Sequence, residues 1–105
     1  PVAAGTKAFV EVPYGATINR VSMYADVSGS AVVDIWKDTY ANYPPTVADT
    51  ITASAKPTIT TAVKSQDSTL TGWTTSITAG DGLMFSVDSC STITKLYVTL
   101  KVTTT

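Results

Sequence analysis

The clearest recognition chemistry in the sequence belongs to Asp34 and Trp36. Two residues apart on an expected strand, they project from the same face of a sheet. An indole ring packs against the apolar C–H face of a sugar ring, while a neighbouring carboxylate accepts hydrogen bonds from its hydroxyl groups. We therefore treat the two residues as a candidate saccharide-binding pair. Burial of Trp36 in a core or a subunit interface is the alternative, because large aromatic side chains in a short chain usually close such contacts.

Trp73 is a second candidate aromatic platform, and burial in the core is weighed equally for it. Tyr40, Asn42 and Tyr43 add polar-tipped side chains of the kind that recognition surfaces favour. Tyr43 stands before Pro44-Pro45, so we expect it to brace its loop, and a Tyr-Pro bond is a position at which cis peptide bonds occur.

Catalytic and metal-binding arrangements are not evident. The chain has no histidine and a single cysteine, Cys90, so a Ser-His-Asp triad, a Cys-His pair and a cysteine metal cluster are all excluded. The seven aspartates and Glu11 are scattered, without calcium-loop spacing and without a clear glycosidase pair. We expect no enzyme activity, no metal and no cofactor.

Charge and hydropathy exclude two further classes of partner. The net charge is −1 and the seven basic residues are scattered, so no basic stripe is available for nucleic acid. No run of eighteen apolar residues exists, and we expect no membrane insertion. Because the chain begins at Pro1 without Met, we expect it to be a fragment or a processed product of a longer protein.

The elements that must position these side chains are short strands. Thr and Ser supply 30 residues, Val and Ile are frequent, and apolar residues alternate with period two between Gly, Pro, Asn and Asp. We expect a hairpin turn at residues 26–30, a loop at 38–49 with one helical turn at 46–49, a polar loop at 65–68 and a frayed tail at 103–105. The expected strands cover residues 7–12, 17–25, 31–37, 50–52, 58–63, 69–77, 83–88 and 93–102.

This pattern predicts one all-β domain over residues 1–105, a small antiparallel β-barrel or sandwich of six to eight short strands. Two strand faces carry tyrosine and are expected at a subunit interface, since they are not plainly polar. They consist of Ile18, Arg20, Ser22 and Tyr24 on one strand and Lys95, Tyr97, Thr99 and Lys101 on another.

Several segments, in this order and spacing, resemble a module of bacteriophage virion proteins. They are residues 15–20 (GATINR), 25–38 (ADVSGSAVVDIWKD), 43–49 (YPPTVAD), 72–73 (GW) and 79–81 (AGD). Together they resemble the C-terminal receptor-binding head domain of siphophage tail proteins, notably those of lactococcal phages. The resemblance covers residues 12–102, nearly the whole chain.

The resemblance implies a β-barrel or sandwich head with Greek-key character that forms a homotrimer at the tail tip or baseplate of the virion. Such heads bind host cell-wall saccharides, often phosphate-bearing polysaccharides, and are not enzymes. Some family sites combine Trp, Asp, His and Arg. This chain lacks His, so the matching residue types are Trp73, Trp36, Asp34 and the single arginine, Arg20. A purely structural module for trimerisation or virion decoration, without a ligand of its own, is the alternative.

Overall fold

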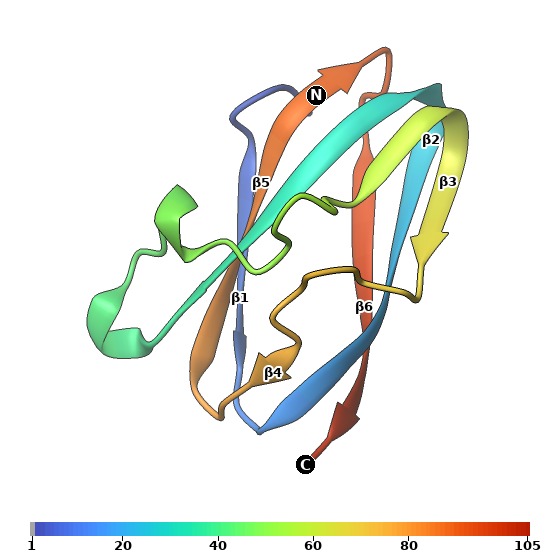
Figure 1. Ribbon diagram of the computed structural model, residues 1–105. Helices are drawn as coiled ribbons and strands as arrows, with labels where there is room; N and C mark the ends of the chain where they lie inside the picture. Colours follow the sequence, from blue (N-terminus) through green and yellow to red (C-terminus); the bar gives the residue numbers. More distant parts are fainter. Residues whose placement is uncertain (1) are drawn as a thin grey trace.

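The computed structural model describes residues 2–105 as an antiparallel β structure with two layers (Figure 1). Two short 3-10 helices, η1 (Tyr40–Asn42) and η2 (Val47–Asp49), follow the second strand. The strands are β1 (Lys7–Val12), β2 (Ala16–Asp38), β3 (Thr58–Asp67), β4 (Ser76–Ile77), β5 (Asp81–Ser91) and β6 (Leu96–Thr104). The predicted small all-β antiparallel sandwich is confirmed, and β1 lies beside β5 rather than β2, as Greek-key connections allow.

β2 is a continuous strand of 23 residues that folds the sheet over on itself. Its residues 16–25 pair with β6, its residues 30–38 pair with β5, and β3 follows its other edge. β1 extends the sheet beyond β5. We call β1, β5 and residues 30–38 the β1 layer, and β6, residues 16–25 and residues 64–67 the β6 layer. Figure 1 shows β2 crossing between the layers at the top of the molecule.

The predicted hairpin turn at residues 26–30 is wrong. The two halves of β2 pair with other strands, and the ladder with β3 shifts register on both sides of Gly29, so the strand bends through irregularities. Gly29 is required for space rather than for a turn. A Cβ atom there would lie 2.5 Å from the carbonyl oxygen of Ser91, so any larger residue would push β5 away from the bend.

Aliphatic side chains from both layers fill the space between them. One cluster includes Val21, Ile35 and Leu83, and a second includes Met23 and Val33. These burials confirm the predicted inner faces of Val21 with Met23 and of Val33 with Ile35. Because Val33 and Ile35 point inward, the side chains between them in residues 30–38 point outward, and this outer face is where the candidate pair was expected.

Ile18 departs from its prediction. It was expected to share an outer face with Arg20 and Tyr24, but it is 2% exposed and belongs to the core. The pairing of β2 with β6 shifts register between Ile18 and Arg20, and such a bulge changes which side chains face inward. Only the remaining members of the predicted face stay on the outside of the β6 layer.

The middle of the chain contains fewer strand residues than predicted. The expected strand at 69–77 survives only as β4, because Leu70 and Gly72 adopt positive φ angles of 51° and 76° that interrupt extended backbone. The expected strand at 50–52 provides a single bridge, from Thr50 to Trp36. Conversely, most of the predicted polar loop at 65–68 belongs to β3, which runs to Asp67.

The loop after β2 has the predicted character. Its Tyr43–Pro44 peptide bond is cis, and η2 supplies the predicted helical turn, closed by reciprocal contacts between Thr46 and Asp49. The tail prediction is wrong, since β6 continues to Thr104 and the Thr105 N–H donates to Gly15.

Candidate functional site

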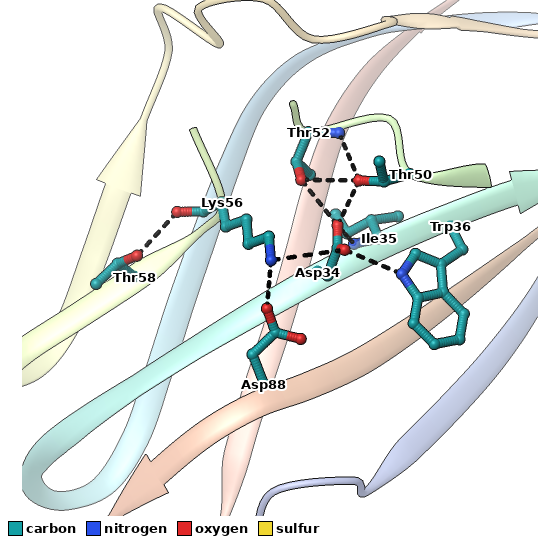
Figure 2. Close-up of polar contacts among 8 residues, drawn as sticks. All are labelled: Asp34, Ile35, Trp36, Thr50, Thr52, Lys56, Thr58 and Asp88. Atoms are coloured by element: carbon teal, nitrogen blue, oxygen red, sulfur yellow. Dashed lines mark hydrogen bonds and ion pairs between the residues drawn. The ribbon is translucent and has the colours of Figure 1, made fainter. Parts of the chain in front are cut away.

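Asp34 lies under the segment that follows η2, and its carboxylate holds that segment against the β1 layer (Figure 2). Its carboxylate accepts hydrogen bonds from Thr50 Oγ1 at 2.6 Å and Thr52 Oγ1 at 2.8 Å. It also accepts from the Ile35 N–H at 2.8 Å and from Trp36 Nε1 at 3.0 Å. Asp34 is 1% exposed, so no surface remains for a ligand to contact.

The electrostatics of Asp34 show that this carboxylate is held in its charged form. Burial acts to raise the pKa of Asp34, but the hydrogen bonds from Thr50, Thr52 and Trp36 outweigh it and the pKa lies below its ordinary value. Lys56 Nζ stands 3.9 Å from Asp34 and 2.6 Å from Asp88. The hydrogen bond to Asp88 raises the pKa of Lys56. Asp34 therefore acts as an internal clamp.

Trp36 is half-buried on the outer face of the β1 layer. Its indole N–H is occupied by Asp34, and the ammonium group of Lys7 lies 5.7 Å from the ring centroid. The structure therefore brings Asp34 and Trp36 together, as the sequence predicts. The carboxylate accepts a hydrogen bond from the indole N–H, however, and does not face an open space beside the ring.

Trp73 and Arg20 lie apart from this pair. Trp73 is 9% exposed in the core, and its indole N–H donates to the Ala55 carbonyl at 2.9 Å. Arg20 is half-buried on the β6 layer, opposite Lys101. The four residues that sequence reasoning proposed as ligand contacts thus do not converge on one surface.

A pocket of about 300 Å³ lies instead between the loop after β2 and the outer face of β1 and β5. Its lining combines three aromatic rings, two carboxylates, two glycines, a threonine and a proline. These residues are Phe9, Glu11, Asp38, Thr39, Tyr40, Tyr43, Pro45, Gly80 and Gly82. We call it the loop pocket.

The aromatic wall of the loop pocket depends on a glycine. A Cβ atom at Gly82 would lie 2.3 Å from Cζ of Phe9, so the ring of Phe9 lies directly over this glycine. Tyr43 meets Phe9 edge to face, with ring centroids 5.0 Å apart and an interplanar angle of 80°. The two rings form a right-angled corner, and Tyr40, which is 85% exposed, adds a third ring.

The two carboxylates flank this corner. Glu11 and Asp38 both stand opposite Gly82 in the register of the sheet, on either side of it. Two strand spacings place their Cα atoms about 10 Å apart. Asp38 Oδ1 accepts from the Thr39 N–H and from Asn42 Nδ2, which fixes the side chain at the start of the loop.

Sequence reasoning missed half of this pocket. Tyr40 and Tyr43 were named as recognition residues, although Tyr43 was expected mainly to brace the loop. Phe9, Glu11 and Gly82 were not, because they come from strands far away in the sequence. The alternation within β1 places Phe9 and Glu11 on one face, but only the pairing with β5 shows that this face adjoins the loop.

A second hollow, which we call the edge groove, opens between the free edges of β1 and β6. Its volume is about 540 Å³ and its lining is mainly aliphatic. The lining residues include Val10 of β1 and Leu96, Val98, Leu100 and Val102 of β6. The inward-facing residues of β6 are only half-buried because no strand covers them at this edge of the described chain.

Neither a metal centre nor a relative identifies the chain. Within residues 2–105, no group of three or more His, Cys, Asp and Glu side chains is placed to hold a metal ion. The same residues contain no helix with the length and hydrophobicity needed to cross a membrane. Comparisons of the chain with protein-family models, curated proteins and solved structures gave no match.

Proposed function

We propose that this chain is a non-catalytic saccharide-binding domain, the receptor-binding head of a bacteriophage tail protein. In this role it binds cell-wall saccharide of the host from the tail tip or baseplate of the virion, as a homotrimer. The loop pocket carries the saccharide part of the proposal. The assignment to a phage tail rests on the sequence segments that resemble such heads.

The chemistry of the loop pocket suits a sugar. The exposed rings of Tyr40 and Tyr43 line the pocket, and a tyrosine ring is an apolar platform for the C–H face of a pyranose ring. Asp38 and Glu11 supply acceptors for its hydroxyl groups. A volume of about 300 Å³ is at the small end for ligand pockets, which favours one sugar unit of a longer polymer.

Trimer formation would raise the apparent affinity for a polymer when each single site binds weakly. Several heads that bind the same polymer raise the apparent affinity by factors of about 10² to 10⁴ without new contacts. The edge groove supports association, because it leaves apolar side chains and two unpaired strand edges uncovered. The exposed Tyr24 and Tyr97, which face each other on the β6 layer, offer a second surface of interface character.

A structural module without its own ligand is the second candidate. One observation favours it: Asp34 and Trp36, the most distinctive pair in the sequence, satisfy each other inside the fold. In that case the loop pocket is a surface hollow and the edge groove is the functional contact.

The test uses the purified domain and whole host cells. We expect it to compete with phage adsorption, and we expect isolated cell-wall polysaccharide to change its tyrosine and tryptophan fluorescence. Tyr40→Ala should weaken both effects, whereas Val63→Ala, which removes an exposed side chain of β3 that lines neither the loop pocket nor the edge groove, should leave polysaccharide binding unchanged. Light scattering should report a trimer, and no reducing ends should be released. A trimer that neither binds polysaccharide nor competes would favour the structural module.

A further inference from the structure

The loop pocket carries information about the charge of its ligand. Its aromatic corner, formed by Phe9 and Tyr43 at 80°, borders one small volume together with Tyr40. Rings arranged around a common space attract a cation, because the face of each ring is electron-rich. A neutral sugar can stack on a single aromatic ring, so stacking alone does not account for three rings around one pocket.

The charged side chains of the pocket have a single sign. Glu11 and Asp38 both line it, and no lysine or arginine does. No ion pair within residues 2–105 involves either carboxylate. Elsewhere in the β1 layer the carboxylates have cationic partners: Asp34 and Asp88 share Lys56, and Asp81 lies 3.9 Å from Lys37. Two unneutralised carboxylates beside three rings favour a positive ligand and repel a phosphate.

We infer that the loop pocket binds a positively charged ammonium group of its ligand. The group is either the protonated amine of an amino sugar or a quaternary ammonium substituent, and both carry the positive charge that the rings and carboxylates attract. The inference rests on the proposed saccharide site, since it concerns the same pocket. It also differs from what the resemblance implies, because phosphate-bearing groups would have to be recognised elsewhere on the domain.

The experiment compares charged probes with neutral probes of the same shape. Choline is titrated against 3,3-dimethylbutan-1-ol, and glucosamine against glucose, at neutral pH with amide and aromatic NMR signals as the readout. We expect each cation to shift the signals of Tyr40, Tyr43 and Phe9 and to bind about tenfold more tightly than its neutral counterpart. The choline and glucosamine arms show which source of the ammonium group is preferred.

Variants separate charge from shape. Glu11→Gln and Asp38→Asn remove the charge while keeping the size of the side chain and one acceptor oxygen, so each should remove most of the preference for choline over its neutral isostere. Asp67→Asn is the matched control, because it removes one carboxylate at the end of β3 and should leave the preference unchanged. Equal affinity for charged and neutral probes would overturn the inference, as would a preference that persists in the Glu11→Gln, Asp38→Asn double variant.

The outcomes also distinguish this inference from the proposed function. If cell-wall polysaccharide binds and competes but the charge preference is absent, the inference fails and the proposed function stands. If the ammonium probes bind selectively while no cell-wall saccharide does, the inference stands and the proposed function fails.

Discussion

Asp34→Asn is the substitution that tests the internal clamp most directly. Asparagine keeps one oxygen, which still accepts from the Ile35 N–H, Thr50 and Thr52. Its NH₂ group replaces the oxygen that accepts from Trp36 Nε1, so two donors face each other and the indole N–H loses its acceptor. A buried donor left without a partner costs about 1–3 kcal/mol, with more for bonds to a charged group. We expect a loss of about 2–3 kcal/mol from a total of about 5–15 kcal/mol.

The pH dependence of this loss has a definite sign. The pKa of Asp34 in the folded protein is below its ordinary value of 3.8. Its contribution to stability is therefore complete above pH 3.8 and is lost as the pH falls through the lower, folded-state pKa. The difference between wild type and Asp34→Asn should thus be full at pH 7 and should shrink in strong acid.

The assay is urea denaturation followed by tryptophan fluorescence and far-ultraviolet circular dichroism, at pH 7 and pH 3. Asp88→Asn is the matched control, because Asp88 is exposed and also contacts Lys56. An exposed ion pair contributes about 0–1 kcal/mol. If Asp34→Asn costs no more than Asp88→Asn at pH 7, the hydrogen bonds to Asp34 do not stabilise the fold and its role as a clamp is refuted.

Three further outcomes follow from other contacts. Gly82→Ala should force the ring of Phe9 off the sheet and weaken ligand binding about tenfold in a titration, with a thermal midpoint near that of wild type; unchanged binding would contradict the role of the ring. Trp73→Phe should cost about 1–3 kcal/mol in urea, through lost volume and a lost indole hydrogen bond, while ligand affinity stays unchanged. The carboxyl group of Asp26 should titrate with a pKa of about 2 by NMR, because the side chain of Thr94 and the Lys95 N–H donate hydrogen bonds to it. The contribution of Asp26 to stability should therefore be lost as the pH falls from 3.8 to 2.

The strands were predictable where the two faces of a strand differ in polarity. Val33 and Ile35 lie two residues apart on the inner face, and β6 alternates with the same period, so these inward-facing residues could be assigned from the alternation. The fold of β2 was not predictable, because Gly29 looks like a turn residue whether it supplies a positive φ or merely space. Leu70 and Trp73 were placed in a strand for a similar reason: a buried turn and a strand with a weak pattern look alike in sequence.

The candidate site was predictable only in part. Reasoning from spacing correctly placed Asp34 and Trp36 on one face, but it could not show that Thr50 and Thr52 cover the carboxylate from a later segment. Burial of a charged residue becomes visible only when its partners are known. The loop pocket escaped prediction for the complementary reason, since Phe9 contributes to it through the pairing of β1 with β5.

The clamp and the loop pocket share one stretch of chain, and this arrangement has a physical basis. Residues 33–38 continue a strand whose outward side chains are Asp34, Trp36 and Asp38. The returning segment that starts at Thr50 covers Asp34, and Trp36 donates to that carboxylate and forms a backbone bridge with Thr50, so both side chains stabilise the fold. Asp38 lies where β2 ends, beyond that cover, and remains free to face the pocket. A rigid clamp immediately before the loop limits how far Tyr40 can move, and a fixed aromatic group loses less conformational entropy when a ligand binds. Under the proposed function, the distinctive side chains along this stretch have two roles: some anchor the fold, and others line a pocket beside that anchor.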